Sequence, residues 1–472
     1  MHFPISRRAF AAGAALLPLA NSQLFAGASR PVAAPANPLV RQRADAQVFR
    51  HDDGYYYLTG SVPEYDRLVL RRSRTLAGLA TAPEAVLWRH QASGPMSGFL
   101  WAPELHLIDG RWIMYFAAGP SGGGEDVFRI RTYAIVCDGP DPMKGKWSVL
   151  GEFKAPWDSF NLDSTVFTHR GQRYFAWAQR EPGIETNSNL YIAPLATPLT
   201  LAAQTTRLTI PTLDWEIRGF KVAEAPAVIE RNGRLFMTYS ASATDARYCL
   251  GLLTIDADAD LMDARAWTKS EQPVFVTCRE TSVFGPGHNS FTVDERGRDV
   301  LVYHGRDYEA ITGDPLLDPN RHTRMQRLYY KPDGSPDFGV PVGNGALPER
   351  FSSARLPGLH LAHQGARAFV GDAALPATQF RATAADAGSV RLSPILLPDH
   401  ALAVTSDGSV SLARAGAGGF ANGADQFRRV PGAARGTVQF ESRLQPGKAL
   451  SSAAGGLHLA PRTDPATLWK AD

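Results

Sequence analysis

Three carboxylate side chains stand in short apolar runs, where an ionised group is out of place. Asp45 and Glu224 have alanine on both sides, and Asp163 follows a leucine and precedes a serine. No lysine or arginine is adjacent to any of them in the sequence. If the fold gathers these groups in an apolar pocket, burial and mutual repulsion raise their pKa values. One carboxyl can then stay protonated near neutral pH while another stays ionised.

That asymmetry is what hydrolysis of a glycosidic bond requires. One carboxylic acid protonates the leaving oxygen, and one carboxylate acts on the opposite face of the sugar. The alternative is that each group is an ordinary carboxylate of a surface turn. This alternative is the better one for any single residue, but three acids at matched positions of a repeat favour a joint role.

Five similar hairpins position these groups. Each has a polar head, a short strand, a turn that usually carries glycine, and a second strand rich in aromatic residues. The heads are Asp45, Glu104, Asp163, Glu224 and His288, at spacings of 59, 59, 61 and 64 residues. A near-constant period is typical of radial repeats, and the innermost strand of each propeller blade lines the central axis.

We therefore predict an all-β chain with a five-bladed β-propeller over residues 37–350. The five heads converge at one end of its axis. The long amphipathic helical patterns that a parallel α/β fold requires are missing between the strands.

A second repeat follows the propeller. Pro357, Pro398 and Pro446 each precede a leucine by four residues, and "ATQF", "ADQF" and "ATLW" each place an aromatic residue three positions after alanine. Three units of about forty residues indicate a β-trefoil over residues 355–472. An irregular β-sandwich is the alternative.

The N-terminus reads as an export signal. "SRRAF" at residues 6–10 precedes a short apolar stretch, and "AGA" at 26–28 offers a cleavage site. We predict a twin-arginine signal peptide over residues 1–28, a linker over 29–36, and a periplasmic or secreted protein. The apolar stretch is too short to span a membrane. A net charge of +3 on 472 residues argues against a nucleic acid or a membrane surface as partner.

The chain has three cysteines, Cys137, Cys249 and Cys278. Three are too few for a disulfide framework, and we expect buried small hydrophobic residues. A single Cys249–Cys278 bridge stays open.

Several motifs resemble those of a known family, the family 43 glycoside hydrolases, and within it the exo-acting α-L-arabinofuranosidases that trim 1,5-linked arabinan. The similarity spans residues 37–345. The motifs are "RADAQVFRHDDGYYYLTGSVPEYD" (43–66), "FLWAPELHLIDGRWIMYFAAG" (99–119), "NLDSTVFTHRGQRYFAWAQ" (161–179), "FKVAEAPAVIERNGRLFMTYSAS" (220–242), "GPGHNSFTV" (285–293) and "RHTRMQRLYYKPDGSPDFG" (321–339).

The resemblance implies an inverting hydrolase with a carboxylate trio. Asp45 is similar to the base that activates water, Glu224 to the general acid, and Asp163 to the residue that tunes and orients the acid. The chain departs from the family at two neighbours: Ala46 stands where proline is usual, and Ala225 where glycine is usual. Proline would fix φ, and glycine would permit an unusual φ.

Four further residues are assigned to the substrate site. Trp101 suits the apolar face of a sugar, although a core tryptophan between blades is equally consistent. Glu104 is expected to bind sugar hydroxyls or a positive partner. Arg321 matches a late arginine of the family that keeps an acid ionised, the alternative being a solvated loop arginine. His288 matches a histidine near the axis.

No metal is predicted to be required. In the family the residue matching His288 lies close to a cation, often calcium, through water, so a structural calcium near His288 is the one metal considered. No carboxylate-rich calcium loop and no zinc spacing is visible in the sequence.

The predicted activity is release of L-arabinofuranose from the non-reducing end of plant cell-wall arabinan or arabino-oligosaccharides by a monomer. The second candidate is an arabinofuranosidase of arabinoxylan or a β-xylosidase. The third is a non-catalytic sugar-binding propeller and trefoil. The trefoil itself resembles arabinofuranose-binding modules, and the alternative for it is a purely stabilising domain.

Overall fold

The computed structural model describes residues 34–121, 126–414, 420, 423–453 and 456–472. The predicted signal peptide, and most of the linker after it, lie outside this part. Within it, regular structure consists of strands and of 3₁₀ turns of three or four residues, which confirms the all-β prediction. None of its helices is long and apolar enough to cross a membrane.

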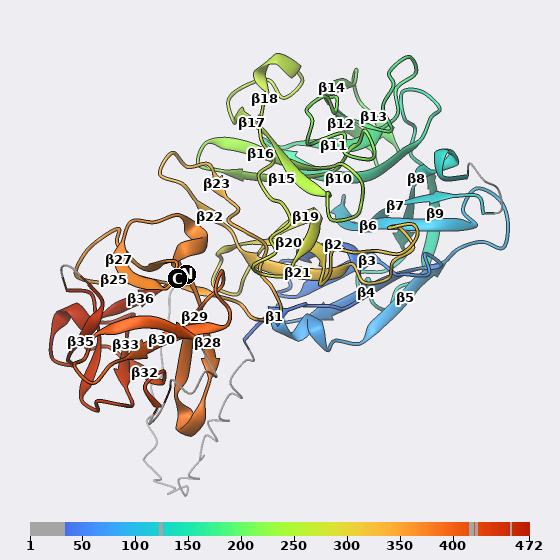
Figure 1. The fold of residues 1–472 in the computed structure, drawn as a ribbon. Helices are drawn as coiled ribbons and strands as arrows, with labels where there is room; N and C mark the ends of the chain where they lie inside the picture. Colours follow the sequence, from blue (N-terminus) through green and yellow to red (C-terminus); the bar gives the residue numbers. More distant parts are fainter. Residues whose placement is uncertain (1–33, 122–125, 415–419, 421–422, 454–455) are drawn as a thin grey trace, which may run out of the picture. The chain divides into compact units, whose positions relative to one another are not determined.

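Five antiparallel sheets follow one another along the chain from β2 to β21, in blue to yellow-orange in Figure 1. Their strands, sheet by sheet, are β2 (Ala44–Arg50), β3 (Tyr56–Ser61), β4 (Arg67–Ser73) and β5 (Glu84–Arg89); β6 (Gly98–Ile108), β7 (Arg111–Gly119), β8 (Arg131–Cys137) and β9 (Trp147–Glu152); β10 (Asn161–His169), β11 (Gln172–Gln179), β12 (Asn189–Thr197), β13 (Thr200–Leu201) and β14 (Thr206–Thr209); β15 (Ala223–Arg231), β16 (Arg234–Ala241), β17 (Cys249–Asp256) and β18 (Thr268–Lys269); β19 (Phe284–Val293), β20 (Asp299–Arg306) and β21 (His322–Arg327).

The first strand of each sheet lies against the first strands of its two neighbours. Contacts run from β2 to β6, β10, β15 and β19, and from β19 back to β2. The N-terminal segment adds to this closure, because residues 39–40 form backbone hydrogen bonds with Thr323 of β21 in the fifth sheet. These sheets are the five blades of the predicted propeller.

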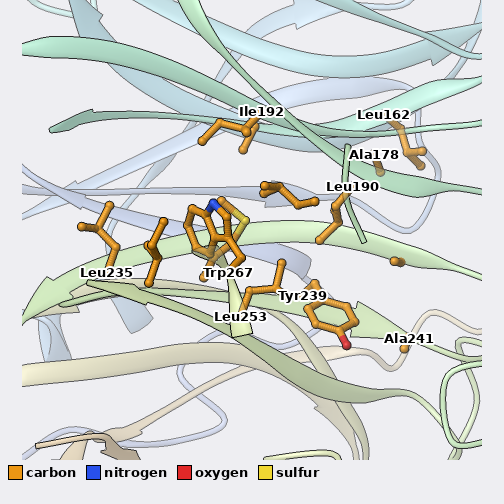
Figure 2. Packing of buried hydrophobic residues seen from close by; sticks show 14 of the residues in the cluster. Leu162, Ala178, Leu190, Ile192, Leu235, Tyr239, Ala241, Leu253 and Trp267 are labelled. Atoms are coloured by element: carbon orange, nitrogen blue, oxygen red, sulfur yellow. The ribbon is translucent and has the colours of Figure 1, made fainter. Parts of the chain in front are cut away.

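Adjacent blades pack through apolar residues of their strands. Figure 2 shows the cluster between blades 3 and 4, where Leu190 and Ile192 of β12 face Leu235, Tyr239 and other residues of blade 4. The named side chains are at most 1% exposed. Burying a leucine or isoleucine side chain contributes about 1.5–3 kcal/mol. Second and third strands of adjacent blades therefore contribute the apolar side chains that hold the blades together.

Every inner strand carries a β-bulge near its start, and each bulge contains a residue with positive φ. These residues are Asp45 (54°), Ala102 (46°), Asp163 (51°), Ala225 (52°) and His288 (45°). This left-handed conformation is uncommon for residues other than glycine. A bulge bends its strand and redirects the side chain at that point. The bulges thereby turn the heads of the inner strands toward one place.

The C-terminal strands form a closed, barrel-like sheet in orange and red in Figure 1. Its ring consists of β25 (Glu349–Ser353), β28 (Gln379–Ala384), β29 (Val390–Pro394), β32 (Phe427–Pro431), β33 (Thr437–Ser442) and β36 (Trp469–Ala471). Three hairpins join successive ring strands: β26–β27 (His360–Gln364, Arg367–Gly371), β30–β31 (His400–Val404, Val410–Arg414) and β34–β35 (Lys448–Ser451, His458–Pro461). Six ring strands with three hairpins agree with the three-fold repeat in the sequence. The alternative of an irregular sandwich is wrong.

The three cysteines are buried and free. The Cys249 thiol contacts the carbonyl oxygens of Trp215 and Ala241 at 3.9 and 3.8 Å. The cysteines are therefore small core residues, as predicted, and no Cys249–Cys278 bridge is present.

Closure of the ring depends on one buried amide, which yields a prediction. The Asn37 side chain donates to the carbonyls of Met325 (2.9 Å) and Val342 (3.0 Å) and accepts from the Met325 amide (2.9 Å). Asn37→Ala leaves these buried backbone groups unpaired, and we expect it to lower the free energy of unfolding by about 3 kcal/mol. Urea unfolding measures the change.

The control for this variant is Gln172→Ala. The exposed Gln172 amide donates to a neighbouring backbone carbonyl, and we expect its removal to change stability by less than about 0.5 kcal/mol. Equal stability of the two variants would contradict the role of Asn37.

Candidate active site

A cavity of about 320 Å³ opens where the bulges of the inner strands meet. All three carboxylates of the predicted trio line it, although they lie up to 179 residues apart in sequence. The other lining residues are aromatic or apolar side chains and a few polar groups: Tyr65, Phe99, Trp101, Val127, Phe128, Phe160, Leu162, Asn187, Phe220, Val222, Ser242, Thr244, Tyr248, His288, Asp314, Leu316, Leu317 and Arg321. The structure thus brings together Asp45, Asp163, Glu224, Trp101, His288 and Arg321.

Asp45 is a buried carboxylate held ionised. Ser61 Oγ donates to its Oδ2 at 2.6 Å, and Arg321 Nη1 lies 3.3 Å from its Oδ1. Burial by itself raises the pKa of Asp45, but the charge of the adjacent Arg321, with smaller contributions from the nearby His288 and His304, outweighs burial and holds the pKa well below its usual range. Arg321 therefore lies against Asp45, where its predicted role of keeping an acid ionised would place it.

Glu224 is the opposite case. It occupies β15 directly before the bulge residue Ala225, and no arginine is paired with it among the described ion pairs. Burial raises the pKa of Glu224 to about 7, with the Asp45 charge adding to the rise, while a hydrogen bond from Tyr248 opposes it. This carboxyl is protonated where Asp45 is ionised. One cavity therefore holds an acid and a base together.

Asp163 lies beside both groups and interacts with Glu224. Burial, followed by repulsion from Glu224 and Asp45, raises the pKa of Asp163 well above its usual range. The Ala225 backbone amide donates to it. Ala225 has a positive φ, the conformation that glycine adopts without strain. Ala225 keeps the geometry that the usual glycine would provide, at a backbone cost of about 1–2 kcal/mol.

Two histidines lie beside Asp45. His304 Nδ1 lies 3.2 Å from Asp45 Oδ1, and His288 Nδ1 lies 3.4 Å from the same oxygen and 3.8 Å from Asp163 Oδ2. Burial lowers the pKa of His288, and it lowers the pKa of His304 to about 4. Both rings are neutral near pH 7, so they serve as hydrogen-bonding groups that leave the charge on Asp45.

Aromatic rings form one wall of the cavity. Trp101 makes edge contacts with Tyr65 and Phe99 at centroid distances of 5.5 and 5.2 Å. Trp101 thus lines the pocket and also packs against the apolar cluster between the blades. Tyr65 also accepts a hydrogen bond from Arg321 Nη2 at 2.7 Å and donates to the Leu316 carbonyl. It thereby connects the Asp45–Arg321 pair to the loop that forms the rim.

Glu104 does not reach this cavity. It lies in β6 two residues after the bulge residue Ala102, and it lines a second cavity of about 380 Å³ together with Gln47 and His106. Its Oε2 lies 2.9 Å from His106 Nε2. The residue equivalent to Asp45 in blade 2 is Ala102, and the one equivalent to Glu224 is Trp101. The predicted contact of Glu104 with a sugar stays without support from this placement.

The carboxylates nearest His288 are Asp45 and Asp163, which line the first cavity, and the second cavity adds Glu104 and a glutamine already bonded to the Leu105 backbone. Calcium takes six to eight oxygen ligands, more than these side chains supply. Within the described residues no group of three or more His, Cys, Asp or Glu side chains is arranged to hold a metal. The donors fit only a cation that keeps most of its water, and calcium near His288 stays a prediction.

Four functional contacts were not predicted from the sequence: those of Ser61, Tyr65, Tyr248 and His304. Ser61 lies on the second strand of blade 1 and reaches Asp45 across that hairpin, whereas His304 lies on the second strand of blade 5 and reaches Asp45 from the neighbouring blade. Tyr248 precedes the third strand of blade 4. Pairing registers could have revealed Ser61 and His304, because each lies opposite the bulge, but no sequence signal marks Tyr248.

The raised pKa of Glu224 predicts a dependence of stability on pH. The folded protein keeps the proton of this group up to about pH 7, whereas the unfolded chain, with its ordinary value of 4.5, has released it. Stability from this group is therefore lost as pH rises from about 4.5 to about 7. Glu224→Gln removes this loss of stability, because glutamine does not titrate. Relative to wild type, we expect its free energy of unfolding to gain about 2–3 kcal/mol between pH 4 and pH 8.

Urea unfolding across this pH range tests the expectation. Glu64→Gln, at an exposed carboxylate, is the matched control. A stability difference between Glu224→Gln and wild type that stays constant with pH would contradict a buried, protonated Glu224.

Known proteins are similar to this chain in sequence and fold. The family model described as "Glycosyl hydrolases family 43" matches residues 35–336. An extracellular exo-alpha-(1->5)-L-arabinofuranosidase of Streptomyces avermitilis is 49% identical over 385 residues, which cover 81% of this chain and 79% of the relative. Alpha-L-arabinofuranosidase 43 of Humicola insolens is 47% identical, covering 88% and 89% of the two chains. A crystal structure of alpha-L-arabinofuranosidase from Lactobacillus brevis is 51% identical, with a TM-score of 0.65, covering 66% of this chain and 98% of that one.

Proposed function

We propose that this chain, which belongs to family 43 of the glycosyl hydrolases, is an exo-α-L-arabinofuranosidase. It releases L-arabinofuranose from the non-reducing ends of α-1,5-arabinan or its oligosaccharides. The observation that carries the proposal is the placement of two carboxyls on one cavity, Asp45 paired with Arg321 and Glu224 without an arginine partner among the described ion pairs. The activity agrees with the names of the relatives that cover most of the chain.

Each carboxyl has one role in this reaction. Glu224 protonates the glycosidic oxygen as the bond to the sugar breaks. Asp45 accepts a proton from a water molecule, which attacks the anomeric carbon from the opposite face and inverts the configuration. Arg321 and Ser61 keep Asp45 ionised and oriented. Asp163 holds the backbone that carries the acid, through the Ala225 amide, and its charge state is linked to that of Glu224.

The shape of the cavity favours release of single sugars. Its interior is lined by buried side chains, whereas Phe220 and Leu317 at the rim are 52% and 72% exposed. A terminal arabinose fits the interior, and the rim residues face the sugar that remains attached to the chain. Exposed apolar side chains at a pocket mouth are well suited to the apolar face of such a sugar.

Export through the twin-arginine route is a further part of the proposal. Residues 1–28 carry the signal pattern but lie outside the described residues. Support comes from the sequence itself and from the extracellular relative. A protein in this location meets polysaccharides of plant cell walls. The barrel-like sheet after residue 348 is proposed to bind arabinofuranose units of the same substrate, and the alternative is that it only stabilises the protein.

Analysis of the sugars released from linear arabinan, debranched arabinan and arabinoxylan tests the function. The proposal expects arabinose as the only early product from the first two, and much slower release from arabinoxylan. Arabinobiose as the main early product would overturn the exo assignment. Faster release from arabinoxylan would favour the second candidate, and binding of arabinan without any hydrolysis would favour the third.

A substitution separates the acid from the other members of the trio. Glu224→Gln cannot protonate the leaving oxygen, so we expect turnover of arabinobiose to fall by at least about 100-fold. A nitrophenyl arabinofuranoside should lose far less, because its leaving group needs little protonation. Steady-state kinetics with both substrates measures the effect. Equal losses on both would contradict the acid role.

A further inference from the structure

One tyrosine contacts the proposed acid directly. Tyr248 Oη donates a hydrogen bond to Glu224 Oε1 at 2.7 Å. Tyr248 is 2% exposed, lines the cavity and lies 24 residues after Glu224, at the start of β17 in the same blade. Burial raises the pKa of Tyr248 well above its ordinary value. The phenol therefore keeps its proton throughout the pH range in which Glu224 titrates, and it remains a donor.

The tyrosine ring is held in a fixed position. It stacks on His304 with the rings 3° from parallel and their centroids 5.6 Å apart. On its other side lies Gly287, where an added Cβ would come within 2.4 Å of the Tyr248 ring. The second glycine of "GPGH", Gly287, is thus explained by the space that the Tyr248 ring occupies. Ser240 interacts with the phenol oxygen and also accepts the His288 amide at 2.8 Å.

We propose that Tyr248 is a positioning residue for the acid: by donating to Oε1, it directs the catalytic proton of Glu224 onto Oε2. A carboxyl oxygen that accepts this hydrogen bond cannot also point its own proton along the same line. The proton therefore stays on the other oxygen, from which it passes to the leaving oxygen of the substrate. As Glu224 becomes a carboxylate during this transfer, the Tyr248 bond to Oε1 strengthens, because hydrogen bonds to charged acceptors are the stronger ones.

This inference rests on the proposed function and predicts the behaviour of Tyr248→Phe, which keeps the stacked ring and removes only the hydroxyl. The ionised form of Glu224 loses a donor, so the basic limb of the pH profile of kcat/KM should move up by about one pH unit. With the acid less well oriented, kcat on arabinobiose should fall by about tenfold, and kcat on an activated aryl glycoside should change little. KM should stay close to that of the wild type.

Tyr239→Phe is the matched control. Tyr239 lies in the same blade, is fully buried, and donates to a buried glutamate, Glu216, at 2.6 Å. It does not line the cavity. Its removal should lower the melting temperature by an amount similar to that for Tyr248→Phe, while the pH profile stays that of the wild type.

Three outcomes decide the matter. A shifted basic limb and a selective loss on arabinobiose support the role of Tyr248. A wild-type profile in Tyr248→Phe, with Glu224→Gln still selective between substrates, overturns this inference and leaves the function intact. If Tyr248→Phe does not fold, Tyr248→Met is the second variant: its flexible apolar side chain occupies the space of the ring without supplying a donor, and an unchanged basic limb in it would overturn the inference equally. Loss of selectivity in Glu224→Gln would instead overturn the acid assignment.

Discussion

The site depends on one backbone constraint, the bulge with positive φ near the start of every inner strand. Without it, the alternation of a regular strand would leave the carboxylates of neighbouring blades on different levels of the axis. The bulge instead gives blades 1 and 3 the same geometry at Asp45 and Asp163, and it lets Glu224 project directly before Ala225. None of these positive-φ residues is glycine, so each carries a backbone cost of the order of 1 kcal/mol. Packing between the blades supplies the stability that maintains them.

Once the carboxylates are gathered, their neighbours decide their ionisation. Burial acts to raise the pKa of each carboxyl. The pKa values of Asp45 and Glu224 nevertheless move in opposite directions, because Arg321 is paired with Asp45 and not with Glu224. The neutral histidines sharpen the difference, since a second cation beside Asp45 would also stabilise the ionised form of Glu224. The acid and the base therefore result from one buried environment with a single arginine placed to one side. This arrangement lowers stability at neutral pH, because Glu224 resists ionisation in the folded state.

Much of this could be predicted from the sequence, because repetition makes the blades visible. The hairpin period located Asp45, Asp163 and Glu224, and the family resemblance gave them roles. The same period indicated the wrong site residue in blade 2. Glu104 is a polar residue at the right spacing, but the bulge lies two residues earlier, at Ala102. A bulge shifts the register by a residue and leaves no compositional mark. The contact of Tyr248 could not be predicted for a different reason. It depends on how the third strand of the blade approaches the axis, and no local sequence pattern encodes that approach.

The central claim is that Glu224 is a protonated acid beside an ionised Asp45, and its own titration tests that claim most directly. Protein labelled with ¹³C at the glutamate carboxyl carbons can be followed by NMR from pH 3 to pH 9, with Glu224→Gln identifying the resonance. We expect this one carboxyl to titrate near pH 7, about where burial raises its pKa. A midpoint near the ordinary value of 4.5 would contradict the account, because both carboxyls would then be ionised at neutral pH and neither could supply the proton.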